Sequence, residues 1–228
     1  MNAIINAYLN EETHPFFSKT ATFDGMLEVP RIRANDQIII PKHIVPLSKA
    51  KYCENDFLAE SFIAFYEKDS LFKDFLQHPK KYFPILRKAK GVIAPDCSLY
   101  FDDPFFINMI AIYMRNSIAH FLQENGFYVI ANPRWGNEKT YTTAILPEEM
   151  AFLGCPKESI IAIGSFGAIR EIEEREHFIT GLRIMLCKLT PKIVLVYGAM
   201  PSKIFDEFRH LAYFIQFEEW TKYVKGGK

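Results

Sequence analysis

Several polar residues stand directly after short apolar runs of the chain, where they could bind a ligand or move a proton. Asp96 follows the run at 91–95, so burial and neighbouring groups can adjust the pKa of its carboxyl. We expect Asp96 to serve as an acid, a base or a ligand for a cation, with Ser98 at the same ligand site. The alternative is that Asp96 caps the segment that follows it, a common structural use of aspartate.

The sequence NPRWG at 132–136 follows a second run and places a guanidinium beside an indole. This combination suits an anion or a stacked base or sugar, so Asn132, Arg134 and Trp135 are predicted to bind a ligand. The structural alternative is that Trp135 closes the mouth of the fold while Arg134 pairs with a carboxylate of a loop.

The segment GSFGAIR at 164–170 joins a third run to a predicted helix. Backbone amides in such a turn can face a phosphate or a carboxylate, which predicts an anion site at Gly164, Ser165, Gly167 and Arg170. The segment matches neither the Walker A loop nor the three-glycine dinucleotide fingerprint, so a tight turn without a ligand is the alternative. Tyr197, near the end of the last run, is expected to complete the wall of the site.

Two further groups of polar residues are interpreted as structural. YMRN at 113–116, with His120, falls more than two turns into a long predicted helix, which favours a buried structural network. The other group is typical of a solvated helix face and consists of Glu171, Glu173, Glu174, Arg175 and Glu176. The chain has no GxSxG, no HExxH and no zinc-type spacing, so we predict no metal site and can name no cofactor.

These residues must be positioned by the apolar runs, which alternate with longer amphipathic segments. The runs lie at 61–67, 91–95, 127–132, 160–164 and 193–198. Each is nearly continuous in β-branched or aromatic residues, which indicates strands of a parallel sheet that are buried on both faces. Helices are predicted between and after them, at 69–77, 82–88, 104–125, 170–189 and 202–208.

This alternation predicts an α/β fold of parallel βα units, in which polar residues at the C-terminal strand ends meet at one crevice. A reduced or distorted TIM-like barrel is the favoured arrangement and an open doubly wound sheet is the alternative. Residues 1–60 are interpreted as an irregular lead-in with a short strand at 37–40, residues 61–224 as the α/β domain and residues 225–228 as a flexible tail. Together they form one expected structural domain.

Composition limits the classes of function. Lys plus Arg and Asp plus Glu each total 27 of 228 residues, so the chain lacks the basic surplus typical of proteins that coat nucleic acid. No apolar run approaches the roughly 18 residues that span a bilayer, and no basic leader precedes the chain, so we expect a cytoplasmic protein without a membrane partner. The expected partner is a small nucleotide-like ligand or nucleic acid, and the oligomeric state is not predicted.

The order of several motifs resembles a bacterial and phage family known as domain of unknown function 4417. The motifs are IIIPKHIVPLSKAK, HPKKYFPILRKAKGVIAPDCSLYFDDP, YMRN, GFYVIANPRWG, IAIGSFGA and LTPKIVLVYG, between residues 38 and 198. Cys97 and Met114 depart from the family's usual wording. The resemblance implies a mobile-element context and no activity. A fainter likeness, from Ala94-Pro95-Asp96 to Ile163-Gly164-Ser165, is to transglycosylases that exchange a guanine base, which are TIM barrels.

Two main hypotheses follow. The first is an enzyme acting on a nucleotide, nucleic acid or glycosidic bond, which requires Asp96 to lie within two hydrogen-bonded steps of Trp135 and of the turn at Ser165. The second is a non-catalytic binder of a nucleotide-like ligand or a protein, which would have no carboxylate or histidine in the cleft besides Asp96. A third, a scaffold, would show a large exposed apolar patch.

Overall fold

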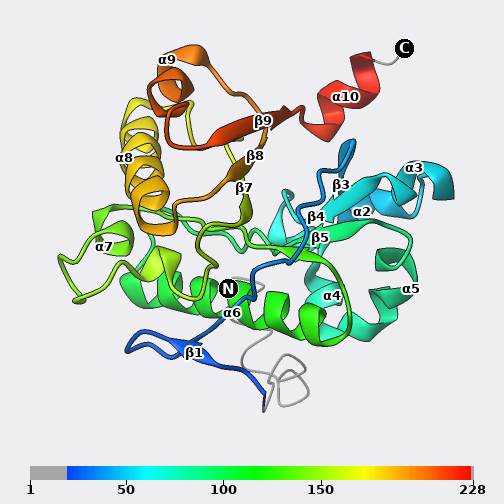
Figure 1. Cartoon of the computed structure of the whole chain (residues 1–228), viewed down its shortest axis with the longest axis horizontal. Coiled ribbons are helices and arrows are strands. Elements are labelled where there is room, and N and C mark those ends of the chain that lie inside the picture. Colours follow the sequence, from blue (N-terminus) through cyan, green and yellow to red (C-terminus); the bar gives the residue numbers. More distant parts are fainter. Residues whose placement is uncertain (1–19, 227–228) are drawn as a thin grey trace.

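The computed structural model describes residues 20–226, and its seven main strands are all parallel (Figure 1). The first sheet has the order β3 (His43–Pro46), β4 (Ser61–Ala64), β5 (Gly91–Ile93) and β6 (Val129–Ile130). The second has the order β7 (Ile160–Gly164), β8 (Ile193–Tyr197) and β9 (Tyr213–Phe217). One parallel bridge, Ala131 to Ile161, joins β6 to β7, so the strands follow one another in space as they do in sequence. The predicted α/β class with parallel strands is confirmed.

The strands form no closed barrel. Among the described residues β3 and β9 each keep an unpaired edge, whereas closure requires every strand to be paired on both sides. The strand order also lacks the reversal that characterises a doubly wound sheet. Side chains from all seven strands nevertheless share one buried cluster, whose members include Ile44, Phe62, Ile130, Leu195 and Phe217.

Two long helices cover the strands. Helix α6 (Phe105–Glu124) runs beneath both sheets in Figure 1, and α8 (Ile172–Leu189) lies beside β7 and β8. The predicted helix at 104–125 is confirmed with Pro104 and Asn125 as its caps, and Gly126 follows with a φ of +79° that an L-residue rarely adopts. The predicted helices at 69–77, 82–88 and 202–208 are shorter, as α4 (Lys73–Gln77), α5 (Phe83–Leu86) and α9 (Ser202–Phe205), with turns of 3₁₀ helix beside them.

Two strands fall outside the predicted ones. The predicted strand at 37–40 is wrong, because the strand begins only at His43 and pairs with β4. Residues 43–60 therefore belong to the sheet, with helices α2 (Leu47–Ala50) and α3 (Asn55–Ala59), and are not an irregular lead-in. Strand β9 was also unexpected, because its first residue Tyr213 is 67% exposed and the run is not continuously apolar.

The remaining elements are short. A two-stranded antiparallel sheet, β1 (Phe23–Asp24) with β2 (Val29–Pro30), packs on α6, and α7 (Glu138–Tyr141) precedes β7. Helix α10 (Trp220–Gly226) packs near β3, and it includes two residues of the predicted flexible tail. Residues 1–19 of the predicted lead-in and 227–228 of the tail lie outside the described residues.

The polar residues of α6 form a structural network, as predicted for the segment at 113–116. Arg115 is 2% exposed and donates from Nε to Asn116 Oδ1 at 2.8 Å and from Nη2 to the Ala151 carbonyl at 3.2 Å. Asn116 donates to the carbonyls of Pro30 and Leu153, both at 2.9 Å. The network joins α6 to the segments around Pro30 and around 151–153 by hydrogen bonds, and its residues do not line the cavity described below.

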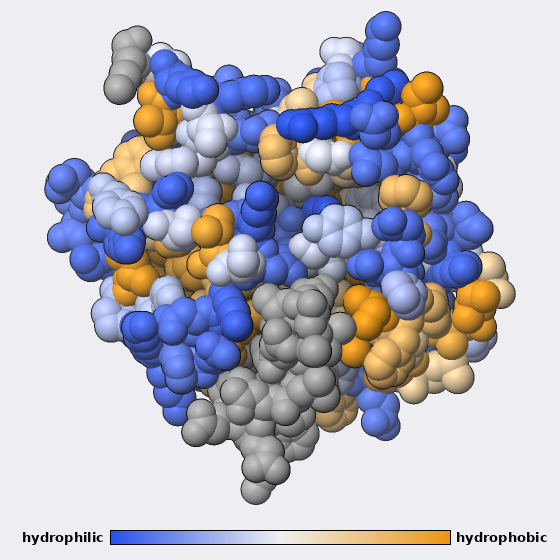
Figure 2. All heavy atoms as spheres, turned by 180° about the vertical axis from the view of Figure 1, so that it is seen from behind, coloured by the Kyte–Doolittle hydropathy of each residue, from blue (hydrophilic) through white to orange (hydrophobic). Residues whose placement is uncertain are grey.

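The face of the molecule drawn in Figure 2 shows no single large apolar area. On the face drawn in Figure 2, hydrophobic residues form several separate groups with hydrophilic residues between them. None of the helices in residues 20–226 is long and apolar enough to cross a membrane.

Candidate functional site

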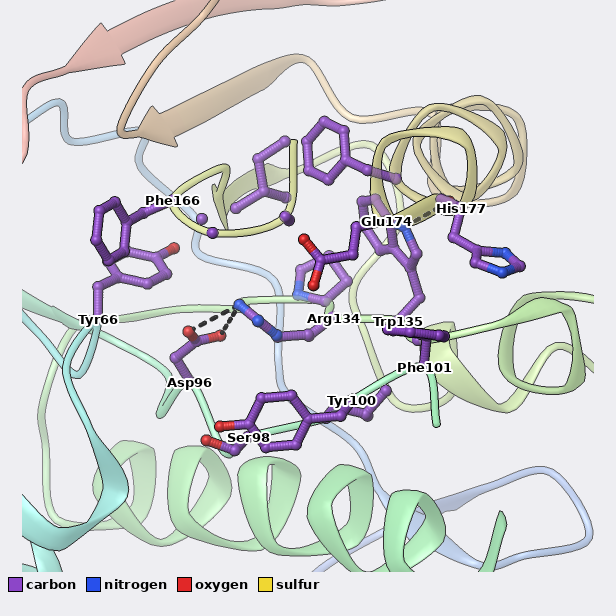
Figure 3. A pocket seen from close by; sticks show the side chains of 18 of the residues that line it. Tyr66, Asp96, Ser98, Tyr100, Phe101, Arg134, Trp135, Phe166, Glu174 and His177 are labelled. Carbon is purple, nitrogen blue, oxygen red and sulfur yellow. Dashed lines mark hydrogen bonds and ion pairs between the residues drawn. The ribbon is translucent and has the colours of Figure 1, made fainter. Parts of the chain in front are cut away.

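A cavity of about 320 Å³ opens at the C-terminal ends of β4, β5, β6 and β7 (Figure 3). Its walls are the segments that follow these four strands, completed by the first turns of α8. Asp96, Ser98, Arg134, Trp135, Gly164 and Gly167 all line it. Three of the predicted strand ends therefore meet, as parallel strands with short connections require.

An ion pair between Asp96 and Arg134 occupies the centre of one wall. Arg134 donates from Nη1 to both carboxylate oxygens of Asp96, at 3.1 and 2.9 Å, and the two side chains are only 14% and 23% exposed. The neighbouring carboxylate raises the pKa of Arg134, so its charge is permanent. Asp96 is thus one hydrogen-bonded step from Arg134, which is adjacent in sequence to Trp135.

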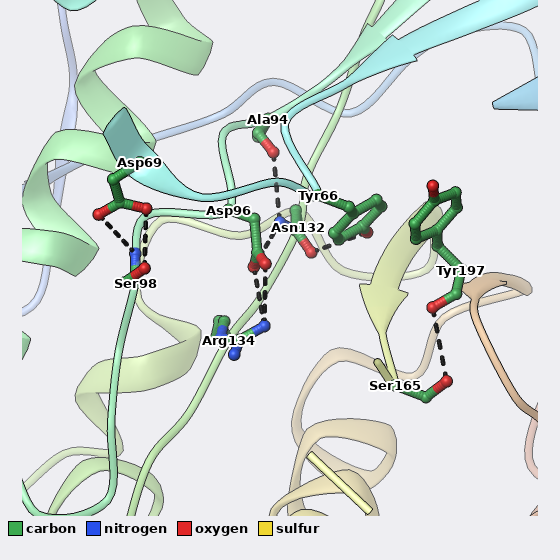
Figure 4. A network of polar contacts seen from close by, with 9 residues as sticks. All are labelled: Tyr66, Asp69, Ala94, Asp96, Ser98, Asn132, Arg134, Ser165 and Tyr197. Carbon is green, nitrogen blue, oxygen red and sulfur yellow. Dashed lines mark hydrogen bonds and ion pairs between the residues drawn. The ribbon is translucent and has the colours of Figure 1, made fainter. Parts of the chain in front are cut away.

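Asn132 supports this pair from behind (Figure 4). Its amide donates to the Ala94 carbonyl at 3.3 Å and to Asp96 Oδ1 at 3.4 Å, and its oxygen accepts from the Tyr66 hydroxyl at 3.1 Å. Burial, and then the Asp96 charge, raises the pKa of Tyr66 well above its ordinary value, so this hydroxyl stays protonated. These hydrogen bonds connect the ends of three strands through Tyr66, Asn132 and Asp96.

Ser98 is oriented by a second carboxyl. Its hydroxyl donates to Asp69 Oδ1 at 2.7 Å and its amide donates to Oδ2 at 3.4 Å. Burial raises the pKa of Asp69, and the hydrogen bonds from Ser98 oppose that rise. The lone pairs of the Ser98 hydroxyl remain available to a donor in the cavity.

Trp135 is a buried part of the wall. Its indole N–H donates to the His177 carbonyl at 3.2 Å, and its ring packs on Phe178 at 5.6 Å and Phe152 at 6.0 Å between centroids. A β-carbon on Gly181 of α8 would lie 2.3 Å from this ring, so glycine is required for the helix to approach. The side chain is 9% exposed, which leaves little of its face for stacking on a ligand.

Only some residues of the turn at 164–170 line the cavity. Gly164 lies against the Tyr66 ring, where a β-carbon would come within 2.9 Å, and Gly167 has a φ of +81°. The Ser165 hydroxyl is buried and donates to the Ala199 carbonyl at 2.6 Å. Arg170 is exposed, with its guanidinium 4.8 Å from the Phe166 ring centroid.

Four predicted site residues thus lie off the cavity lining: Asn132, Ser165, Arg170 and Tyr197. Tyr197 stacks on Tyr66 with centroids 4.7 Å apart and accepts from the Trp220 amide at 2.9 Å, and burial raises its pKa to about 12. Asn132 also lies behind the wall, where it holds Asp96. The anion site predicted at the turn is reduced to the backbone around Gly164 and Gly167.

The cavity also contains residues that were interpreted otherwise or missed. Glu174 was predicted on a solvated face, yet it is half-buried and its carboxylate points into the cavity in Figure 3. Glu171, Glu173 and Glu176 are exposed as predicted. The spacing of Glu174, Phe178 and Gly181 puts them on one helical face, and the apolar members of that face were the signal that could have separated Glu174 from its neighbours.

His177 also enters the lining, and its ring nitrogen Nδ1 lies 2.8 Å from the Tyr141 hydroxyl. Six aromatic rings complete the walls, from Tyr66, Tyr100, Phe101, Trp135, Phe166 and Phe178. The cavity can thus take a flat ligand and present to it carboxylates, a guanidinium and a hydroxyl. Within residues 20–226 no group of three or more histidines, cysteines, aspartates or glutamates is arranged to hold a metal ion.

Comparison with known proteins places the chain in a phage context. A family model described as "Domain of unknown function (DUF4417)" matches residues 21–218. A "Gene 1 protein" of Mycobacterium phage L5 is 23% identical over 175 residues, which cover 76% of this chain and 72% of the phage protein. A "Gene 1 protein" of Mycobacterium phage D29 is 21% identical over 173 residues, covering 76% of this chain and 61% of that protein. No solved structure matches. The likeness to guanine transglycosylases has no support from these comparisons.

Proposed function

Because the chain belongs to the family described as Domain of unknown function (DUF4417), whose name assigns no activity, we propose its function from the site: an acid/base enzyme that acts on the glycosidic bond of a nucleotide, free or within nucleic acid. The observation that carries the proposal is the presence of two differently held carboxylates, Asp96 and Glu174, in one aromatic-lined cavity. The phage relatives are named only as "Gene 1 protein", and those names assign no activity.

The two carboxylates are suited to different roles. Asp96 is fixed as an anion by Arg134, whereas the Glu174 carboxylate has no hydrogen bond or ion pair with any other side chain in residues 20–226. A fixed anion can stabilise the positive charge that develops on a sugar ring, and a free carboxyl can exchange a proton with a leaving group or with water.

The proposed reaction balances as a hydrolysis. The bond between the sugar carbon and the base nitrogen breaks and its electron pair leaves with the base, which accepts a proton from the Glu174 carboxyl. Water adds to the sugar carbon and returns a proton to Glu174, so the enzyme ends unchanged. Another hydroxyl or base in place of water would give transfer through the same steps.

The lining of the cavity supports the enzyme over the alternative. Asp96 bonds directly to Arg134, and Arg134, Trp135 and Gly164 line the same cavity, which supports a shared site. The hydrogen bonds of Asp96 lead to Arg134 and Asn132 and, among the described residues, not within two steps to Trp135 or Ser165, so the expected two-step link is not found. Glu174 and His177 enter the cleft besides Asp96, whereas a binder without turnover needs neither. Non-catalytic binding of a nucleotide-like ligand remains the second candidate, and it is favoured by the low exposure of the Asp96–Arg134 pair.

The test is release of free base. The full chain is incubated with the four ribonucleosides and deoxyribonucleosides, their 5′-monophosphates, and single- and double-stranded oligonucleotides, and free base is detected by liquid chromatography with mass spectrometry. We expect release from at least one substrate, abolished in Asp96→Asn and in Glu174→Gln and retained in Glu173→Gln, an exposed neighbour with the same change of charge. Binding without release in any of these would favour the second candidate, and equal release by all three variants would exclude this site.

A further inference from the structure

Arg134 keeps one edge of its guanidinium for a ligand. Asp96 occupies Nη1 alone, and no hydrogen bond uses Nε or Nη2 among the described residues. Neither atom is among the buried side-chain nitrogens left without a partner, so both reach the open part of the cavity. A guanidinium edge with two parallel N–H donors binds a pair of acceptor atoms in one plane.

Glu174 offers the complementary group across the cavity. Its carboxylate points inward in Figure 3, on the side of α8 that faces Arg134, and forms no ion pair with it. Space for a ligand therefore lies between a donor edge and an acceptor. A ligand that presents acceptors on one edge and an N–H on another would satisfy both side chains.

The charges of the lining disfavour an anion there. Three acidic residues, Glu67, Asp96 and Glu174, line the cavity against two basic ones, Lys68 and Arg134, and the Glu67 carboxylate accepts hydrogen bonds from Ser48. Asp96 already neutralises Arg134, and Glu174 lies free, so a phosphate beside them would meet uncompensated negative charge in a partly dehydrated site. An uncharged polar ring meets no such penalty.

The walls suit a flat ring, and the mouth suits what is attached to it. Six aromatic side chains line the cavity, and two of them, Tyr100 and Phe166, are 54% and 50% exposed. Aromatic walls stack on the π-face of any nucleobase. Exposed rings at the rim leave the phosphate in water.

We infer that the ligand enters the cavity base first: an uncharged nucleobase lies between the Nε and Nη2 edge of Arg134 and the carboxylate of Glu174, and the phosphate stays at the mouth. This inference rests on the proposed function and adds to it the orientation of the substrate and the two residues that recognise it. It assigns Glu174 a contact with the base itself: its carboxylate form accepts an N–H of the base in binding, and its protonated form is the one that can pass a proton to the base.

Calorimetric titration of the full chain tests the orientation. The probes are the four nucleosides, their 5′-monophosphates, ribose 5-phosphate and inorganic phosphate. At least one nucleoside is expected to bind within about threefold of its own 5′-monophosphate, and excess ribose 5-phosphate or phosphate is expected not to displace it. Glu174→Gln is expected to weaken nucleoside binding about tenfold or more, because the amide both accepts more weakly and adds a misplaced donor, while Glu173→Gln stays within about twofold.

Two kinds of result would overturn the inference. If 5′-monophosphates bind more than about tenfold tighter than nucleosides, or if phosphate displaces them, the phosphate end occupies the cavity and the inference fails while the proposed function survives. Tighter binding of the 5′-monophosphates to Glu174→Gln than to wild type would also show that the phosphate occupies the cavity, because it would mean that Glu174 repels the bound anion. If no nucleoside or nucleotide binds, the inference fails, and if no oligonucleotide releases free base either, the proposed function fails with it.

Discussion

At the scale of single residues, the site is organised around the pair of Asp96 and Arg134. Both were predicted as site residues from sequence position alone, because each follows an apolar run. The structure shows them paired directly with each other. Their bond means that Arg134 cannot act as an unpaired cation and that Asp96 is held as an anion. Glu174 was assigned to solvent because acidic residues at a helix start are usually solvated, and only the packing of α8 onto Trp135 turns it inward.

The contribution of the Asp96–Arg134 ion pair to the free energy of unfolding should be measurable. Asp96→Asn leaves the Arg134 guanidinium short of a counter-charge in a mostly buried wall, and we expect a loss of roughly 1–3 kcal/mol in the free energy of unfolding. The matched control is Glu207→Gln, which breaks the Arg183–Glu207 pair whose side chains are 56% and 50% exposed, and should cost about 1 kcal/mol or less. Denaturant titration measures both, and equal losses would contradict the burial argument.

Titration of the Asp69 carboxyl should make the free energy of unfolding depend on pH. Burial raises its pKa above the ordinary 3.8, more than the Ser98 hydrogen bonds lower it. A carboxyl whose pKa is higher in the folded state stabilises the fold while protonated, below about 3.8, and that contribution is lost as pH rises through the folded pKa.

Relative to Asp69→Asn, which does not titrate, the wild-type chain should therefore lose unfolding free energy over the pH range that begins near the ordinary value of 3.8 and rises through the folded pKa. Denaturant titrations of both proteins across this range supply the difference. A wild-type chain that gains stability over the variant as pH rises would show that the hydrogen bonds outweigh burial.

At the scale of elements, local sequence signals located the two long helices and strands β4 to β8 better than strands β3 and β9. Pro104 and Asn125-Gly126 mark the ends of α6 chemically, so its bounds were predictable. Strand β3 was missed because prolines at 41 and 46 surround it, and β9 because it is partly exposed. A strand at the end of a sheet depends on the partner that pairs with it, and that partner is distant in sequence.

The approach of α8 to the site depends on one residue of that helix. Gly181→Ala would place a β-carbon 2.3 Å from the Trp135 ring, and we expect a loss of roughly 1–3 kcal/mol from overpacking. An exposed helical glycine would instead gain about 1 kcal/mol on this change, so the sign of the effect decides. Thermal or denaturant unfolding measures it, with the exposed neighbour change Thr180→Ala expected within about 0.5 kcal/mol of wild type. A more stable Gly181→Ala chain would mean that α8 does not pack on Trp135.

At the scale of the whole molecule, the sequence indicated parallel strands whose ends meet, and this much is confirmed. Whether the strands close depends on pairing between β3 and β9, residues 43–46 and 213–217, and no local pattern encodes so distant a contact. The single bridge between Ala131 and Ile161 is likewise a property of the assembled sheets. That bridge lies next to Asn132 and Gly164, so the seam between the sheets opens into the cavity.

The indole signals of the two tryptophans test whether the cavity at the strand ends binds a nucleotide-like ligand. The chain has two tryptophans: Trp135 lines the cavity, and Trp220 packs on Phe57 and Tyr223 at the other end of the chain's fold. In ¹H–¹⁵N spectra of the full chain, assigned with Trp220→Phe, titration with nucleosides and their 5′-monophosphates should shift the Trp135 indole signal and leave the Trp220 signal in place. A shift of the Trp220 signal alone, or no shift with any of these ligands, would contradict the account.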